Sequence, residues 1–156
     1  MDIPAKARAV IIGGGVVGCS IAYHLGKLGW TDVVLLERKQ LTCGTTWHAA
    51  GLIAQLRATQ NMTRLAKYSQ ELYFGLEEET GVATGFKRNG SITVALTDER
   101  MEELRRSAAM ARAFGVEIDE ISPSDIQSRY PGLTVDDAVG GVWLPKDGQA
   151  DPVNIT

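Results

Sequence analysis

The hydrophobic residues at the start of the chain follow a strand–helix–strand pattern. Short apolar runs occupy 9–12 and 33–36, and the first run leads directly into three glycines at 13–15. Gly29 lies between the runs and is a typical helix stop. The pattern therefore predicts a βαβ unit over 8–37. Four apolar residues have the three-and-four spacing of one face of its helix: Val17, Ile21, Leu25 and Leu28.

The glycines between the first predicted strand and helix form a G-x-G-x-x-G motif on Gly13, Gly15 and Gly18. Gly13 allows a tight turn, Gly15 has no Cβ to obstruct a pyrophosphate, and Gly18 lets the helix pack close to the strand. The N–H groups and the dipole at the helix start attract phosphates. Glu37 follows Gly18 by 19 positions, where a carboxylate can accept hydrogen bonds from a ribose 2′-hydroxyl. These features predict a site for FAD or NAD rather than NADP.

Beyond the first sixty residues the pattern changes to longer helices separated by short strands. The predicted elements are helices at 61–80 and 97–115, a short helix begun by Ser122 and Pro123, and strands at 91–96, 116–121 and 141–144, the second of these strands at a sheet edge. The apolar face of the 97–115 helix comprises Met101, Leu104, Ala108 and Ala111. This part does not supply the further parallel strands that a dinucleotide-binding sheet needs.

The last predicted element is a helix that Asp151 and Pro152 open shortly before Thr156. A cap followed by a first-turn proline is typical of the start of a full helix, and residues 151–156 are too few to form one. We therefore expect the chain to be the front of a longer protein.

The composition is that of an ordinary globular domain, with 156 residues, 44% hydrophobic and 22% charged. The net charge of −3 gives no reason to expect nucleic acid or an anionic membrane as a partner, and no apolar run reaches the length of a membrane span. The two cysteines, Cys19 and Cys43, form no metal-binding pair and suit a reducing compartment. Because the start runs straight into the first strand, we expect no targeting segment and a cytoplasmic location.

The stretch 38–60 carries the remaining candidate chemistry and reads as a loop with a short helical piece. Small-residue clusters at 44–46 and 49–51 flank Trp47 and His48, and small residues let a ligand approach the backbone closely. His48 could be an ordinary hydrogen-bonded histidine or a ligand-binding one. Trp47 could cover a ligand or fill the core, and the spacing alone separates neither pair of alternatives.

Three other polar features are interpreted as structural. Cys19 lies near the positive end of the first helix, where its thiol pKa could be lowered, but a packing role is favoured. His24 has no evident partner, and the acidic run at 77–79 is typical of a solvated helix end rather than a metal site.

The sequence RAVIIGGGVVGCSIAYHLGKLGWTDVVLLERKQLTCGTTWHAAGL at 8–52 resembles the N-terminus of dimethylglycine and sarcosine dehydrogenases, FAD enzymes of the D-amino-acid-oxidase-like superfamily. The resemblance continues through LEEETG at 76–81, NGSITVAL at 89–96 and GVWLPKDGQADP at 141–152. It implies an α/β fold class, in which a Rossmann-like FAD-binding βαβ unit is followed by a helical segment and the start of an α+β substrate domain. The implied divisions are 1–60, 61–150 and 151–156, the last returning to the FAD domain.

The resemblance also implies roles for individual residues. Glu37 would take the adenosine ribose with Arg38 beside it, and residues 44–46 would lie along the pyrophosphate and ribityl chain. The histidine of the TWHAAG motif, His48, would be bonded covalently to the flavin. Together the glycine motif and the resemblance predict cofactor-binding positions at Gly13, Gly14, Gly15, Val17, Gly18, Glu37, Arg38, Gly44, Thr45, Thr46, His48 and Gly51. We identify no catalytic residue and expect no bound metal.

The implied reaction is oxidative N-demethylation of a small methylated amine such as dimethylglycine or sarcosine. The implied partners of the full-length protein are an electron-transfer flavoprotein and a folate. Two alternatives stay open, namely a non-catalytic nucleotide-binding regulator on the same fold and an NAD-dependent dehydrogenase. The GTTWHAAG stretch favours FAD over NAD, and the presence of His48 argues against the regulator.

Overall fold

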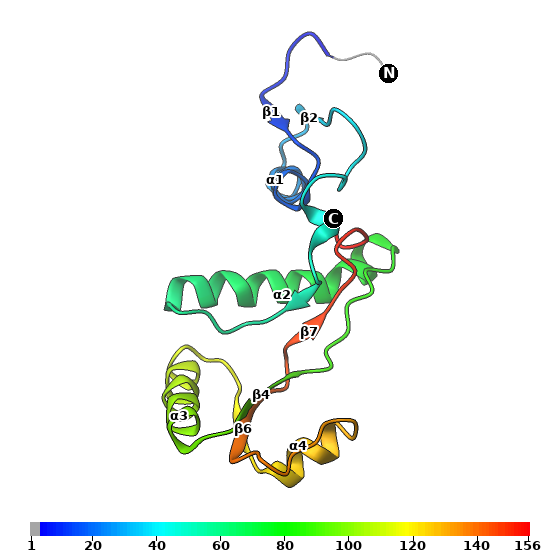
Figure 1. Cartoon of the computed structure of the whole chain (residues 1–156). Helices are drawn as coiled ribbons and strands as arrows, with labels where there is room; N and C mark the ends of the chain where they lie inside the picture. The colour runs from blue at the N-terminus through cyan, green and yellow to red at the C-terminus, as the bar shows by residue number, and fades with distance from the viewer. Residues whose placement is uncertain (1–3) are drawn as a thin grey trace.

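The structure is a computed structural model that describes residues 4–156, so the expectation about the N-terminal start rests partly on residues outside the described part. Figure 1 shows three parts in succession: a βαβ unit, a long helix, and a small sheet with a helix on either side. The elements are β1 (Ala9–Ile12), α1 (Val16–Lys27), β2 (Val33–Leu36), a 3-10 turn η1 (Thr46–His48), β3 (Leu52–Ile53), α2 (Gln60–Thr80), β4 (Ser91–Ala95), α3 (Asp98–Ala113), β5 (Asp119–Ile121), α4 (Pro123–Arg129), β6 (Gly140–Leu144) and β7 (Gly148–Gln149).

The predicted βαβ unit is confirmed. Strands β1 and β2 pair in parallel, with Ala9 opposite Val33 and Ile12 opposite Leu36. Helix α1 connects them, as a crossover between parallel strands requires. The predicted strand bounds agree with the observed ones because apolar runs of this kind, bounded by glycine and acidic residues, are strong strand patterns.

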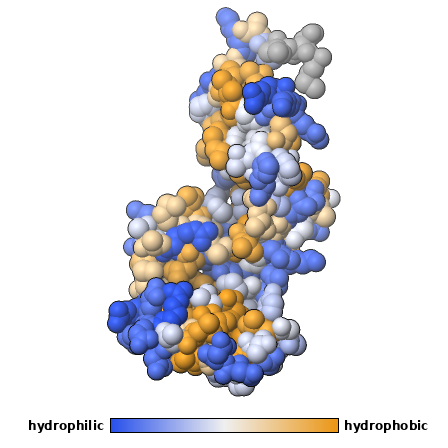
Figure 2. Space-filling model, viewed as in Figure 1, coloured by the Kyte–Doolittle hydropathy of each residue, from blue (hydrophilic) through white to orange (hydrophobic). Residues whose placement is uncertain are grey.

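The apolar face predicted for α1 lies open to solvent rather than in a core. Val17 is 70% exposed and Leu28 is 74% exposed, whereas Gly18 is the buried residue of the helix. The helix therefore packs on the strands at Gly18, while Val17 and Ile21 are exposed and Leu25 is half-buried. In Figure 2, apolar surface is visible over this part of the molecule.

The second part of the chain forms a three-stranded antiparallel sheet in the order β4-β6-β5, so the predicted edge position of the 116–121 strand is confirmed. Helix α3 packs on it through the predicted face, and all four predicted residues are buried. The predicted caps are also confirmed. The Thr97 hydroxyl accepts from Arg100 N, and Ser122 forms a capping box with Asp125.

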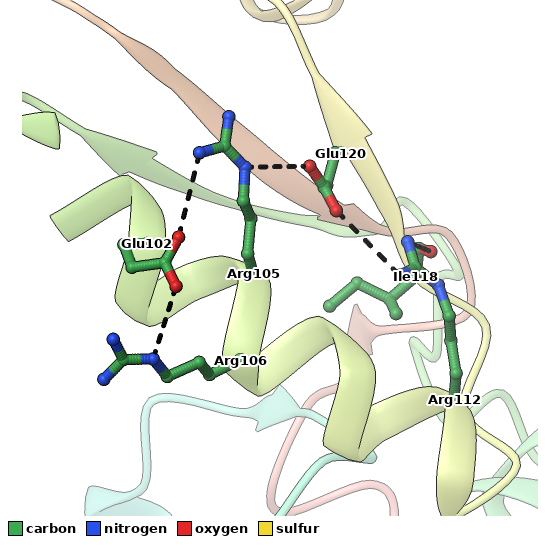
Figure 3. A network of polar contacts seen from close by, with 6 residues as sticks. All are labelled: Glu102, Arg105, Arg106, Arg112, Ile118 and Glu120. Atoms are coloured by element: carbon green, nitrogen blue, oxygen red, sulfur yellow. Dashed lines mark hydrogen bonds and ion pairs between the residues drawn. The ribbon is translucent and has the colours of Figure 1, made fainter. Parts of the chain in front are cut away.

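Charged side chains run along the outer surface of α3 toward β5 (Figure 3). Glu102 pairs with Arg105 at 4.0 Å and with Arg106 at 3.5 Å. Glu120, on β5, pairs with Arg105 at 3.3 Å and with Arg112 at 3.9 Å. Because all of these side chains are well exposed, the network contributes little to stability.

Strands β3 and β7 were not predicted from the sequence. Leu52 pairs with Gln149 and Ile53 with Gly148 in an antiparallel ladder, and an isolated bridge joins Lys87 to Gln149. Each strand has only two residues, and its partner is distant in the chain, so no local periodicity marks it. Helix α2, expected at 61–80, is confirmed and ends at Gly81 with φ +72°. Within 4–156, no helix has both the length and the apolar character that a membrane span requires.

Candidate functional site

The glycine turn between β1 and α1 adopts the tight geometry that the motif predicts. Gly13 has φ +109°, a conformation that favours glycine, and its N–H donates to the Leu36 carbonyl at 2.8 Å. A Cβ on Gly18 would lie 1.9 Å from the Gly13 carbonyl oxygen, so glycine is required for this close approach of helix and strand. Gly15 precedes α1 and provides no side-chain cap, and the first turn contains no acidic residue. The helix start is therefore electrostatically suited to an anion.

Glu37 folds back onto this turn instead of pointing away from it. Its carboxylate accepts from Gly14 N at 2.8 Å and from Lys39 N at 2.9 Å. The Gly14 hydrogen bond is the main reason that the pKa of the Glu37 carboxyl lies below its usual value. The folded pKa is depressed, so this stabilisation is present at neutral pH and is lost as the pH falls through the folded pKa. A carboxylate offers about four lone-pair positions, so two remain for a ribose.

Thr46 brings the GTTWHAAG stretch against the glycine turn. Its hydroxyl accepts from Val16 N at 3.0 Å, and Val16 is the first residue of α1. A Cβ on Gly15 would lie 3.0 Å from the same hydroxyl oxygen. The two parts of the predicted site, which are 30 positions apart, therefore meet through one side chain.

His48 ends the 3-10 turn η1 and is exposed. The His48 ring lies against Trp47, with ring centroids 3.9 Å apart, and the backbone N–H of His48 donates to the Thr45 carbonyl. Trp47 is itself 55% exposed, so its indole does not fill a core here. The imidazole is thus chemically accessible beside the glycine turn.

A cavity of about 410 Å³ opens next to η1. It is lined by residues from α1, the TWHAAG stretch, β3, α2 and the segment after β7: Val16, Thr46, Ala49, Ala50, Gly51, Leu52, Ile53, Tyr73, Ala150, Pro152 and Ile155. Its lining is mostly apolar, which suits a flat ring system more than a free ion. We call it the η1 cavity.

The remaining predicted positions are less closely assembled. Arg38, Gly44 and Thr45 are exposed on the loop after β2, and Val17 faces solvent from the first turn of α1. None of these four lines the η1 cavity, and neither does His48, although its neighbours Thr46 and Ala49 do. The structure thus brings the glycine turn, Glu37, Thr46 and Gly51 to one region but leaves these four at its periphery.

Several residues near the site are missed by sequence reasoning. Thr42 is buried with φ +68° and donates its N–H to the Gly14 carbonyl at 2.8 Å, which holds the loop onto the turn. A left-handed threonine has no local sequence pattern that would reveal it. Tyr73 lines the η1 cavity, and burial raises the pKa of its phenol, so the hydroxyl stays protonated at neutral pH. Its place on the inner face of a predicted helix could have indicated it.

His24 has a partner that the sequence did not indicate, and this contact joins two helices. Its Nε2 lies 2.8 Å from the Tyr68 hydroxyl, and its Nδ1 donates to the Ser20 carbonyl at 2.6 Å. Nearby, Glu79 accepts from Tyr23 at 2.7 Å and pairs with Lys27, so one member of the acidic run joins α2 to α1. These pairings are long-range and depend on the helix crossing.

Cys19 is half-buried, and burial raises the pKa of its thiol instead of lowering it. In the described residues, no group of three or more His, Cys, Asp or Glu side chains is arranged to hold a metal ion.

The parallel βαβ unit, the glycine turn and the acidic residue after β2 define a dinucleotide-binding α/β protein. Residues 8–156 match the family described as DAO, FAD dependent oxidoreductase, and the chain belongs to this family. The predicted resemblance and the α/β fold class are confirmed.

The similar curated proteins include both enzymes and a regulatory subunit. Sarcosine dehydrogenase, mitochondrial, of Homo sapiens is 43% identical, over 96% of this chain and 16% of the relative. Dimethylglycine dehydrogenase, mitochondrial, of Rattus norvegicus is 44% identical, over 97% and 18%. Pyruvate dehydrogenase phosphatase regulatory subunit, mitochondrial, of Mus musculus is 40% identical, over 98% and 17%. The chain thus spans less than a fifth of the length of these relatives.

A solved structure supports the same fold. L-proline dehydrogenase from P. horikoshii superposes with a TM-score of 0.88 at 32% identity, over 96% of this chain and 39% of that one.

Proposed function

We propose that the protein is an FAD-dependent oxidoreductase that oxidatively demethylates a small N-methylated amine such as dimethylglycine or sarcosine, with the flavin bonded to His48. Identity of 43–44% to sarcosine and dimethylglycine dehydrogenases supports the substrate class. The observation that carries the cofactor part is the hydrogen bond from Val16 N to Thr46, which holds the histidine-containing stretch beside the glycine turn.

The residues of the site fit FAD. Gly15 has no side chain, which leaves the backbone open to a pyrophosphate, whereas a Cβ there would lie 3.0 Å from the Thr46 hydroxyl. Glu37 has lone pairs left for ribose hydroxyls and would repel a 2′-phosphate. The η1 cavity provides an apolar space lined by Thr46 and Ala49, the residues on either side of Trp47 and His48. The remaining predicted positions, Arg38, Gly44, Thr45 and Val17, belong to the proposal as contacts formed when the cofactor is bound.

In this reaction, bound FAD would accept the hydride that leaves the N-methyl carbon of the amine. The protein contributes binding and orientation. The start of α1 would attract the phosphates by its dipole and by the N–H groups that Glu37 and Thr46 leave free, and Glu37 would hold the adenosine end. The apolar lining of the η1 cavity would contact the flavin ring. The proposed partners are a methylated amine, an electron-transfer flavoprotein and a folate.

A non-catalytic regulator is the second candidate, because a pyruvate dehydrogenase phosphatase regulatory subunit is 40% identical to the chain. Both candidates share the glycine turn, so binding of FAD alone does not separate them. Demethylation of dimethylglycine or sarcosine by the full-length protein, measured as formaldehyde released with an artificial electron acceptor, supports the enzyme. If the flavin-loaded protein releases no formaldehyde with any small methylated amine, the result supports the regulator.

The covalent bond is tested by precipitating the full-length protein with acid. We expect the yellow colour to stay in the pellet, and mass spectrometry should find a flavin adduct on the peptide that contains Trp47 and His48. His48→Ala should release the flavin into the supernatant while binding through the glycine turn survives. His24→Ala is the matched control, since His24 is the other histidine of the chain and contacts Tyr68 instead of the site. Flavin found only in the wild-type supernatant would return His48 to a hydrogen-bonding role.

A further inference from the structure

A buried carboxylate closes the antiparallel contact between β3 and β7. Asp147 is 3% exposed, and it lies in the turn between β6 and β7. One of its oxygens accepts from Gln55 N at 2.9 Å, and the other accepts from the Ser91 hydroxyl at 2.7 Å. Gln55 N lies just past the last ladder pair of β3, so the carboxylate takes the place of a strand partner. Both carboxylate oxygens are therefore used to join segments that are distant in the sequence.

The side chains around Asp147 extend this contact into a closed network. Gln55 Nε2 donates to Gln70 Oε1 on α2 at 2.6 Å, and Gln70 Nε2 donates to the carbonyl of Lys146, the residue before Asp147. Gln55 is 3% exposed and Gln70 is fully buried. Within 4–156, no buried side-chain N or O atom lacks a hydrogen-bond partner. A buried polar network that is fully satisfied rigidifies its surroundings, because each missing bond would leave a desolvated group.

The segment that this network holds is a wall of the η1 cavity. Going from Gln55 back toward His48, the chain passes Ile53 and Leu52, which line the cavity, and then Gly51. Gly51 has φ +73° and accepts from Ala150 N at 2.9 Å. A Cβ on Gly51 would lie 2.1 Å from the Ala150 carbonyl oxygen. The stretch 51–55 is thus held against 147–150 along its whole length, and Asp147 closes the end farthest from His48.

We propose that Asp147 is a positioning residue for the flavin: by fixing 51–55, it sets the path of the chain that follows His48 and so one wall of the η1 cavity. This inference rests on the proposed function, because it takes the η1 cavity as the place of the flavin. The carboxylate does not contact the cofactor. It acts through Gln55 N and the ladder between β3 and β7.

The test uses full-length apoprotein from riboflavin-starved cells, to which FAD is added. The rate at which flavin becomes acid-stable is measured for wild type, Asp147→Ala, Asp147→Asn and Ser91→Ala. For Asp147→Ala we expect the rate to fall by about tenfold, as for the loss of one charge-assisted hydrogen bond. Asp147→Asn should restore a rate close to wild type, since its amide oxygen accepts from Gln55 N and its amide nitrogen can donate to Ser91 Oγ. All variants should still bind FAD non-covalently, measured as flavin that acid releases, because the glycine turn is unchanged.

Amide exchange at Gln55 separates positioning from a loss of stability. Among these four proteins, slower flavin attachment should accompany faster amide exchange at Gln55. If Asp147→Ala is too unstable to measure, the same correlation is expected among the other three. Wild-type attachment rates in a variant whose Gln55 amide exchanges freely would show that Asp147 is only a structural brace. Wild-type protein without acid-stable flavin would overturn covalent attachment and this inference together, whereas equal attachment in all four proteins would overturn this inference alone.

Discussion

The two ends of the molecule contain similar elements but bury them to different degrees. The β4-β6-β5 sheet and α3 enclose a contiguous core that includes Ala95, Leu104, Ala108 and Val142. In the βαβ unit, Ile11 is the buried hydrophobic residue of the strands, while Ile12 is 87% exposed. The difference follows from architecture. Three antiparallel strands with helices packed against them can enclose an apolar core, whereas a parallel pair needs cover on both faces.

For the 156-residue chain, this contrast predicts that the end proposed to bind the cofactor is also the less stable end. The glycine turn, Glu37 and His48 all belong to the part with little core of its own. Its connection to the sheet runs through α2, the β3–β7 ladder and the network around Asp147. The site therefore depends on contacts outside the βαβ unit for its geometry.

The largest effect is expected in the 156-residue chain on its own. Amides of β6 and α3 should be protected from hydrogen exchange by about a thousandfold more than those of β1 and β2, because local stability follows buried apolar contact. The chain should also be prone to aggregate, since the parallel pair exposes apolar faces and free edges. Exchange measured by mass spectrometry or NMR checks this. One cooperative melt of a soluble monomer, with equal protection at both ends, would contradict it.

The second prediction compares the same substitution at the two ends. Leu104→Ala, at a position 5% exposed, should lower the free energy of unfolding of the sheet and α3 by about 2–5 kcal/mol through the cavity it leaves. Leu28→Ala, at a position 74% exposed, should change local stability by less than about 0.5 kcal/mol. Native-state exchange of α3 and α1 amides in the full-length protein measures both. A similar cost at the two sites would mean that Leu28 is covered in the full-length protein.

Much of the fold could be predicted because the deciding information is local. The bounds of β1 and β2, the cap at Thr97 and the capping box at Ser122 each depend on a few neighbouring residues. Helix α3 was predictable because its apolar face repeats over several turns. The glycine pattern alone did not distinguish FAD from NAD, and the family match favours FAD.

The parts that were not predictable depend on distant segments. Strands β3 and β7 exist only because residues 52–53 meet 148–149. The His24–Tyr68 contact needs the crossing of two helices, and the burial of Asp147 needs four segments at once. In the sequence, Asp147 stands between lysine and glycine and reads as an exposed turn residue.

The third prediction changes two glycines of the same helix. Gly18→Ala should destabilise the βαβ unit by about 1–3 kcal/mol and reduce FAD retention, because its Cβ would lie 1.9 Å from a backbone oxygen. Gly26→Ala has no atom within 4 Å of the added Cβ and should stabilise α1 by about 0.4–1 kcal/mol. Flavin content and α1 amide exchange in the full-length protein distinguish them. A stabilising Gly18→Ala would show that strand and helix can separate without cost.

The smallest effect is expected from the charges on α3. Glu102→Gln removes two ion pairs, at 3.5 and 4.0 Å, whose side chains are at least half exposed. Water and salt screen such pairs, and holding the long side chains costs entropy, so the change in stability should stay below about 1 kcal/mol and shrink as salt is added. Exchange of α3 amides at low and high ionic strength measures it. The core beneath α3 would then account for most of the stability difference between the two ends. A cost as large as that of Leu104→Ala would instead mean that the network in Figure 3, and not the apolar core, stabilises the sheet end.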